Sequence, residues 1–348
     1  MPRSKPTRDP PPSRGRDHRD PERMVPVIVV GLGEIGRAVA SAALRHPRLS
    51  LVGAIDRDSR LVGRSLQDLG VAGSGVKVAK ELAEVAGQAR GGAVLLCTGS
   101  RVEEVTPQLL ALFRLGLSVV STCEELAYPW LYHAEQAEQL EQAARKAGVQ
   151  VLGTGVNPGF VLDRLVASAA SPVGVVRHVL ARRVVDVRSR RPALQQKVGM
   201  GLSEFEFDAK AERDELGHVG LAQSCALAAL GAGLDVDEVE EELSPVVAEE
   251  DITGGTMTVK AGQVAGVFHR ACGFAEGAEV VRLELTIAAG SEPAGDWLRI
   301  EGEPTIEIEV KGGYPGEQAT AWAVVNAVPS VLECEPGLLT VLDLPAGR

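Results

Sequence analysis

Cysteine is scarce in this sequence. The 348 residues include five cysteines, an odd number, and no two of them form a CxxC pair. An odd number of cysteines without a CxxC pair suggests neither a disulfide framework nor a zinc site. We therefore expect reduced thiols, no bound metal and a cytoplasmic protein. The five positions are Cys97, Cys123, Cys225, Cys272 and Cys334.

Long apolar runs are missing as well. No stretch approaches the ~18 apolar residues that span a bilayer, so we expect no membrane association. Residues 1–24 lack the apolar segment of a secretory signal and are rich in Pro, Arg and Asp, which predicts a disordered leader. They contain seven Lys/Arg and four Asp/Glu and so carry a charge of +3. Because the whole chain carries −11, the remaining residues carry −14. A body this acidic is a poor binder of nucleic acid.

The first half of the sequence alternates short apolar runs with helical patterns. These runs are rich in Val, Leu and Ile and occupy residues 25–30, 49–55, 93–97, 117–121 and 149–153. The alternation predicts an α/β fold with a Rossmann-type, doubly wound parallel sheet. Ligands of such sheets bind beyond the carboxyl ends of the strands.

A glycine-rich segment, GLGEIG (31–36), directly follows the first apolar run and opens a helical pattern. Gly31 permits a tight turn, Gly33 lets the backbone approach a pyrophosphate, and Gly36 allows close packing of helix on strand. The start of the helix, with Glu34 and Ile35, offers free N–H groups to phosphates. The segment therefore predicts a dinucleotide site.

An acid occurs where the ribose of a dinucleotide needs one. Asp56 follows the second run, 20 residues after Gly36, and its carboxylate would bind both ribose hydroxyls of NAD. Arg57 and Arg60 come next, and either would suit a 2′-phosphate. We therefore expect NAD or NADP as cofactor, with use of both.

Two further loops follow strand ends and should meet the nicotinamide. They are CTGS (97–100) and STCEEL (121–126), each placed directly after an apolar run. The carboxyl ends of parallel strands share one edge of a sheet, so both loops should face the cofactor. The expected cofactor contacts in these loops are Thr98, Gly99, Ser121 and Thr122.

The second half has a different pattern. Segments such as VRLELTI and IEIEV alternate with period two, as half-buried antiparallel strands do. Strands are expected at 178–187, 256–273, 279–290 and 297–312, and helices at 158–170 and 217–232. This predicts an α+β substrate and dimerisation domain with an open mixed sheet. The expected divisions are a leader at 1–24, a cofactor domain at 25–153, a second domain at 154–317, and a C-terminal helix and tail at 318–348 that return to the cofactor domain.

Several separated motifs point to one family. They are GLGEIG, VLLCTGS, STCEELAYPW, VLGTGVNPGFVLDRL, GHVGLAQS and PGLLTVLDLP. From about residue 25 to the C-terminus the chain resembles 2,4-diaminopentanoate dehydrogenases and the related native amine dehydrogenases. Its N-terminal domain resembles that of dihydrodipicolinate reductase. The resemblance implies NAD(P)-dependent oxidative deamination of an amine, with release of ammonia, and the reverse reductive amination. It also implies a homodimer and a catalytic glutamate in the loop that matches CEEL.

One departure separates the chain from a true dihydrodipicolinate reductase. That family carries a histidine pair and a Lys-x-Asp-x-Pro-Ser-Gly-Thr segment. The matching region here reads RRVVDVRSRRPALQQKVGMG (182–201), with neither feature. The lysine and histidine chemistry of that enzyme is therefore not expected.

The paired acids Glu124 and Glu125 are the catalytic candidates. A carboxylate beside a nicotinamide would stabilise an iminium by charge and activate water for imine hydrolysis. Alternatively, one acid would cap the following helix, expected to begin near Pro129 or Trp130. We expect one glutamate to face the cleft and the other to face solvent or a helix end, and the sequence barely ranks them.

The substrate residues follow from position and type. Asn157 lies at the domain junction, where it would hold the nicotinamide carboxamide or the substrate, although as the residue before Pro158 it would equally cap a helix. A diamino acid needs a cation for its carboxylate, for which Arg182 or Arg183 is a candidate. A simple amine needs an apolar wall. The candidate substrate contacts are Asn157, Phe160, Arg182, Met200 and His218.

Two other functions remain open. One is a different imine or carbonyl reductase on the same scaffold. The other is a dinucleotide sensor without turnover. The sensor is disfavoured because the glycine segment, the ribose acid and the paired glutamates occur together.

Overall fold

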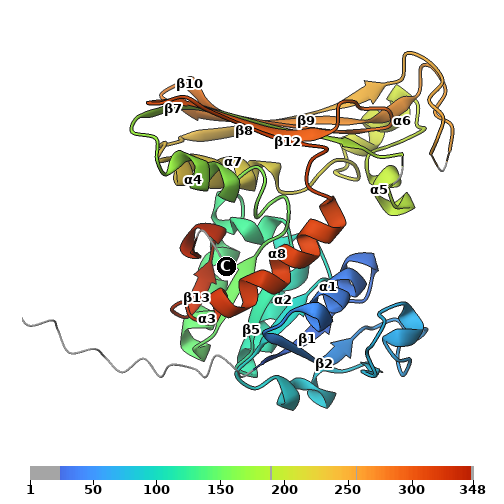
Figure 1. The fold of residues 1–348 in the computed structure, drawn as a ribbon, viewed down its shortest axis with the longest axis vertical. Helices are drawn as coiled ribbons and strands as arrows, with labels where there is room; N and C mark the ends of the chain where they lie inside the picture. Colours follow the sequence, from blue (N-terminus) through green and yellow to red (C-terminus); the bar gives the residue numbers. More distant parts are fainter. Residues whose placement is uncertain (1–23, 189, 256, 346–348) are drawn as a thin grey trace, which may run out of the picture.

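The computed structural model describes residues 24–188, 190–255 and 257–345; apart from Met24, the expected leader lies outside these ranges. Two sheets dominate the described chain (Figure 1). In this view, one is surrounded by helices in the lower half, and the other is a broad open sheet above it. The arrangement confirms the predicted fold class, a doubly wound sheet joined to an α+β unit with a mixed sheet.

In the described residues, seven strands form the first sheet in the order β13-β6-β5-β4-β1-β2-β3. All of their pairings are parallel. Every residue of β4, β5 and β6 is buried, as expected for a parallel sheet covered on both faces. The strands are β1 (Val25–Val30), β2 (Leu49–Ile55), β3 (Val78–Ala79), β4 (Ala93–Leu96), β5 (Ser118–Ser121), β6 (Gln150–Gly153) and β13 (Gly337–Leu339).

Helices from both ends of the chain cover the first sheet. One face packs against α1 (Glu34–Arg45) and α8 (Gly316–Val331). The other packs against α2 (Val102–Arg114) and α3 (Ala134–Ala147). The guanidinium of Arg45 on α1 lies 5.3 Å from the ring centre of Trp322 on α8. The C-terminal segment thus completes the first sheet with both a helix and the edge strand β13.

The second sheet has six strands within the described ranges, in the order β12-β11-β7-β10-β9-β8. It is mixed, because β7 and β10 pair in parallel and the other neighbours are antiparallel. Helices α4 (Arg164–Ala170) and α7 (Leu221–Ala232) pack against one face. Two short helices, α5 (Pro192–Lys197) and α6 (Glu204–Ala211), follow β7 along the chain. The strands are β7 (Val176–Asp186), β8 (Glu238–Val247), β9 (Val264–Ala275), β10 (Ala278–Ala288), β11 (Gly295–Gly302) and β12 (Ile306–Lys311).

Several elements differ from the sequence-based expectation. The edge strand β8 was not predicted, because its segment EVEEELSPVV begins with four exposed glutamates in five residues and shows no buried alternation. The strand expected from residue 256 begins at Val264, and the run 297–312 divides at a turn containing Pro304 into β11 and β12. The helix expected from 158 begins at Arg164, and the carboxylate of Asp163 caps it by accepting the Arg164 N–H. The interpretation of Asn157 as a helix cap is therefore wrong.

Candidate active site

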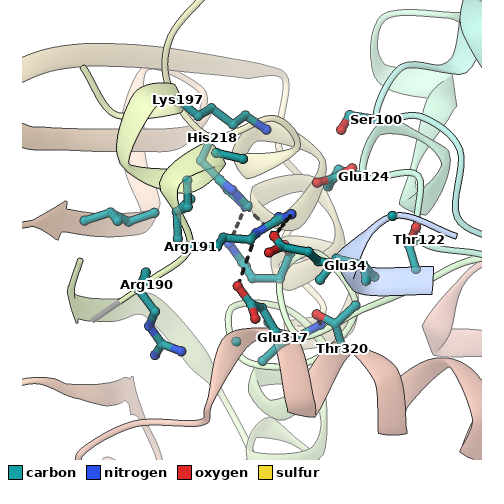
Figure 2. Close-up of a pocket in the computed structure, with 18 of the residues that line it drawn as sticks. Glu34, Ser100, Thr122, Glu124, Arg190, Arg191, Lys197, His218, Glu317 and Thr320 are labelled. Atoms are coloured by element: carbon teal, nitrogen blue, oxygen red, sulfur yellow. Dashed lines mark hydrogen bonds and ion pairs between the residues drawn. The ribbon is translucent and has the colours of Figure 1, made fainter. Parts of the chain in front are cut away.

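A cavity of about 460 Å³ lies between the two sheets, at the carboxyl ends of β1, β4 and β5. Its walls come from the glycine turn, the loops after β4 and β5, residues 156–157, 190–198 and 217–218, and the start of α8. Figure 2 shows its charged and polar side chains converging from several of these segments. This is the edge at which doubly wound sheets bind their ligands.

The glycine turn has the shape that a dinucleotide pyrophosphate requires. Gly31 has φ +86°, and a Cβ there would lie 2.5 Å from the carbonyl oxygen of Cys97. A Cβ on Gly36 would lie 1.7 Å from the carbonyl oxygen of Gly31. A Cβ added to Gly33 would instead meet no neighbouring atom within 4 Å. No side chain caps the N–H groups at the start of α1. Open backbone beside a free helix start fits a phosphate. The turn residues that line the cavity are Gly33, Glu34, Ile35 and Gly36.

Asp56 connects the end of β2 to the glycine turn. Its Oδ2 accepts the Leu32 N–H at 2.6 Å, and its Oδ1 accepts the Asp58 N–H at 2.8 Å. The carboxylate is therefore fixed beside the turn, where a ribose bound to the same dinucleotide would meet it. Arg57 is exposed, whereas Arg60 is held by Asp58. Neither Asp56 nor Arg57 lines the cavity described above.

The loops after β4 and β5 contribute three of the four expected contacts. Thr98, Gly99 and Thr122 line the cavity. Ser121 is buried instead: its hydroxyl donates to the Leu96 carbonyl at 3.1 Å and accepts the Cys123 N–H at 3.1 Å. Ser121 thus shapes the loop rather than lining the cavity.

The structure separates the two adjacent glutamates. Glu125 is buried, with only 6% of its surface exposed, and its Oε2 accepts the Val102 N–H at the start of α2 at 2.8 Å. The same carboxylate lies 3.4 Å from Arg101 and 3.2 Å from the His133 ring. Glu125 therefore caps the preceding helix α2, and not the helix that follows it.

Glu124 lines the cavity, and Figure 2 shows its carboxylate on the same side as Ser100 and near Lys197. Burial raises the pKa of this carboxyl above its usual range, while Lys197, a hydrogen bond from Ser100 and the charge of Arg191 act to lower it. A carboxyl group with a raised pKa in a cleft is a stronger base than an ordinary carboxylate and is a candidate for proton transfer. Glu124 is therefore the member of the pair that is placed for chemistry.

Lys197 is a site residue that the sequence-based analysis missed. It ends α5, lines the cavity, and its ammonium forms no hydrogen bond or salt bridge within the described residues. The only signal in the sequence was a single lysine at the end of LQQK (194–197), after a run of arginines. Such a pattern is typical of solvated surface. Only the approach of α5 to the loop after β5 brings this lysine near Glu124.

Asn157 and His218 meet in the wall of the cavity. Asn157 Nδ2 lies 3.0 Å and the Asn157 carbonyl oxygen 3.1 Å from the same imidazole nitrogen, Nε2 of His218. Burial, reinforced by the nearby charge of Lys197, lowers the pKa of His218 to about 3. The imidazole is thus neutral in the working range of an enzyme, which suits hydrogen bonding and not a permanent charge.

A buried chain of hydrogen bonds supports Asn157 from behind. The Ser224 hydroxyl donates to Asp163 Oδ2 at 2.9 Å and also lies 3.4 Å from the Asn157 side-chain oxygen. The fully buried Asp163 also accepts the N–H groups of Gly159 at 2.7 Å and Arg164 at 2.6 Å. The start of α4, the loop before it and the wall of the cavity are thereby held together.

The arginines do not lie as expected. Arg182 points away from the cavity and pairs with Glu284 at 2.9 Å, so it is wrongly placed for a substrate carboxylate. Its neighbour Arg183 faces the cavity, because successive residues of a strand point to opposite sides. The guanidinium of Arg183 is nevertheless occupied, at 2.6 Å from Asp296 and 2.6 Å from the Tyr314 carbonyl.

Two expected apolar contacts lie outside the cavity wall. Phe160 stacks edge-on against Tyr314, with ring centres 5.1 Å apart, and Met200 is buried in the core beneath the second sheet. The apolar part of the wall comes instead from Val156, Val185, Leu194, Val198, Leu285 and Ile287. No cluster of described His, Cys, Asp and Glu residues is arranged to hold a metal ion. No helix in the described ranges has the length and hydropathy to cross a membrane.

Comparison with known proteins decides the family. A family model described as the 2,4-diaminopentanoate dehydrogenase C-terminal domain matches residues 160–348. The chain is 30% identical to the 2,4-diaminopentanoate dehydrogenase of Acetoanaerobium sticklandii, over 93% of this chain and 94% of that protein. The protein belongs to the 2,4-diaminopentanoate dehydrogenase family. It is also 24% identical to an amine dehydrogenase of Streptomyces virginiae, over 92% of this chain and 96% of that one.

A solved structure supports the same assignment. The amine dehydrogenase from Mycobacterium smegmatis superposes with a TM-score of 0.81 at 25% identity, over 93% of this chain and 97% of that one. These relatives are oxidoreductases that act on CH–NH2 groups. The family that the sequence motifs indicated is thus confirmed, and with it the assignment to an enzyme class.

Proposed function

We propose that this protein is an NAD(P)-dependent amine dehydrogenase, which deaminates an amine oxidatively and aminates the corresponding ketone in reverse. The observation that carries the proposal is the position of Glu124, which faces the same cavity as the glycine turn. A relative of 30% identity over nearly the whole chain is named for such a reaction. The alternatives, a different imine or carbonyl reductase or a sensor, lack this support.

The residues of the cavity suit the proton transfers of this reaction. A nicotinamide bound beside the loops after β4 and β5 supplies the hydride acceptor for oxidation and the hydride donor for reduction. Glu124 would take a proton from the substrate ammonium and release it to solvent, so that its carboxylate is ionised again and can stabilise the iminium by charge. The same carboxylate would then take a proton from the attacking water and return it to the departing ammonia. Asn157 and neutral His218 would orient the reacting group by hydrogen bonds. A carboxylate whose pKa is raised, as that of Glu124 is, accepts a proton more readily than an ordinary one, which suits this exchange.

The glycine turn and Asp56 would hold the cofactor. Asp56 favours two free ribose hydroxyls and would repel a 2′-phosphate, whereas the exposed Arg57 would offset part of that repulsion. We therefore propose NAD as the main cofactor, with NADP also accepted. Steady-state rates with both cofactors would test this directly, and strict NADP dependence would count against it.

We further infer that the substrate amine carries a carboxylate. Lys197 is a cation without a salt-bridge partner in the described residues, and it faces Glu124 across the cavity. An amino group at Glu124 would place a carboxylate of a short amino acid within reach of Lys197. The test compares oxidation of 2,4-diaminopentanoate with that of cyclohexylamine. At a pH above the acid limb of the rate profile, Lys197→Met should raise KM about tenfold or more for the diamino acid only, and a wild-type preference for cyclohexylamine would defeat the inference.

The amine dehydrogenase proposal itself has a simple test. The purified protein with NAD and an amine should generate the absorbance of reduced nicotinamide, and ammonia with a ketone should consume it. Binding of NADH without turnover on any amine would favour the sensor. Reduction of a ketone or imine without dependence on ammonia or an amine would favour the alternative reductase.

The predicted homodimer stays a proposal. The outer face of the second sheet carries partly exposed apolar side chains, including Leu180, Val184, Phe268 and Trp297. Figure 1 shows α4 and α7 on the opposite side of this sheet. A flat, partly apolar face of this kind suits a second copy of the chain. Light scattering at assay concentration should give a dimer mass, and a monomer would refute the proposal.

A further inference from the structure

Arg191 reaches from the segment before α5 to the glycine turn of the first sheet. Its Nη1 lies 3.4 Å from the carboxylate of Glu34, the first residue of α1. Its Nε lies 3.1 Å from the carboxylate of Glu317, in the first turn of α8. Figure 2 shows the guanidinium between these two acids. One side chain thus connects the segment between β7 and α5 to two helices that cover the first sheet.

The hydrogen bonds of this guanidinium are poor. The contact with Glu34 is long at 3.4 Å. Arg191 Nε and the Glu317 oxygen that faces it are both buried, yet neither has a hydrogen-bond partner of acceptable geometry within the described residues. Because a guanidinium offers five N–H donors in a fixed fork, most of its binding capacity is unused. A partly buried cation held this loosely is suited to a better acceptor.

The electrostatics of the turn require a cation at this point. Glu34 stands beside Gly33, where the open backbone fits a pyrophosphate, so its carboxylate would repel the phosphates. The neighbouring cations contact other acids. Arg183 is bound by Asp296, and Lys197 faces Glu124. The Arg190 guanidinium points away from Glu34 in Figure 2. Arg191 alone among these side chains touches a residue of the turn.

We propose that Arg191 is a ligand of the dinucleotide pyrophosphate, supplied by the second half of the chain. On binding, its guanidinium exchanges the poorly aligned carboxylates of Glu34 and Glu317 for phosphate oxygens, which match its fork. The bound cofactor would then connect the segment between β7 and α5 to the glycine turn. The inference rests on the proposed use of a nicotinamide dinucleotide.

The experiment measures dissociation constants of NADH and ADP-ribose by fluorescence or calorimetry, without substrate. Arg191→Gln should weaken both ligands by about 10- to 100-fold, the scale of one charge-assisted contact, and should reduce the salt dependence of binding. Arg191→Lys should give an intermediate loss, because it keeps the charge without the fork. Glu317→Gln should tighten both ligands, because it frees Arg191. The matched control is Arg188→Gln, since Arg188 is held by Asp186 and Glu292 outside the cavity.

The outcomes separate this inference from the proposed function. If the wild-type protein binds neither NADH nor NADPH, the proposed function fails. If the wild-type protein binds NADH but Arg191→Gln binds NADH and ADP-ribose equally well or more tightly, Arg191 is only a bridge between carboxylates and the inference is wrong. A loss for NADH without a loss for ADP-ribose would place the effect at the nicotinamide end and would also overturn it. Melting temperatures identify any variant that fails to fold, and Arg191→Lys then carries the comparison.

Discussion

Replacing each of the paired glutamates with glutamine should produce opposite phenotypes. Glu124→Gln keeps the size of the side chain and removes the proton acceptor that faces the cavity. Turnover should fall by about 10²- to 10⁴-fold, the usual scale for a positioned acid or base. Stability should change little, because the Glu124 side chain caps no helix in the structure. Cofactor affinity should also change little, because Glu34 and not Glu124 borders the glycine turn.

Glu125→Gln should instead lower stability and leave most of the activity. Glutamine retains an oxygen that can accept the Val102 N–H, but the negative charge at the start of α2 is lost, at a cost of about 0.3–1 kcal/mol or somewhat more for a buried site. The half-exposed partner Arg101 adds a few tenths of a kcal/mol. The expected total is about 1–2 kcal/mol, or a decrease of a few degrees in melting temperature.

The assay measures steady-state oxidation of the best amine and thermal unfolding for both variants and the wild type. The structural argument requires a cross-over, with one variant inactive and stable and the other active and less stable. If Glu125→Gln lost turnover at unchanged melting temperature while Glu124→Gln stayed active, the assignment of the two roles would be refuted. If neither lost turnover, the proposed chemistry would be wrong.

Three further predictions follow from single residues. Asp56→Ala should shift the ratio of kcat/KM values toward NADP, because repulsion of the 2′-phosphate is removed; an unchanged ratio would contradict the placement of Asp56. Lys197→Met should move the acid limb of the kcat/KM profile for amine oxidation to higher pH. Lys197 acts to lower the pKa of Glu124, so its removal should raise that pKa, and the ionised carboxylate is the active base. An acid limb that stays in place or moves to lower pH would contradict this reasoning. Asp163→Ala should lower the free energy of unfolding by about 3 kcal/mol or more in urea titrations, because two buried donors and one partly buried donor lose their acceptor; a loss below 1 kcal/mol would argue against that network.

The geometry of the glycine turn was predictable because its determinants are local. Gly31, Gly33 and Gly36 act through backbone conformation and close approach within one turn, and these requirements leave a fixed spacing in the sequence. Asp56 follows a strand that must pair with β1, so its position at the same edge of the sheet was also predictable. The parallel sheet itself followed from short apolar runs alternating with helices.

The substrate end was less predictable because it depends on side-chain direction. Arg182 and Arg183 are adjacent in the sequence, yet they point to opposite sides of β7, and the run of arginines does not show which side faces the cavity. Phe160 and Met200 are apolar residues near the junction, but they pack in the core beneath the second sheet. The sequence carried no signal for the hydrogen bond between Asn157 and His218, which are 61 residues apart.

The sequence alone determined the fold class, the glycine turn, the position of Asp56 at the end of β2 and the family, because each depends on contiguous residues or on a period within one element. Only the tertiary structure decided between Glu124 and Glu125, because their difference depends on which of two neighbouring carboxylates meets the start of α2. It alone brought Lys197 to the cavity and Arg191 to the glycine turn, since both depend on how the segment around α5 approaches the loops of the first sheet. Local patterns record what the backbone can do, whereas the direction of a charged side chain is fixed by partners far away in the chain.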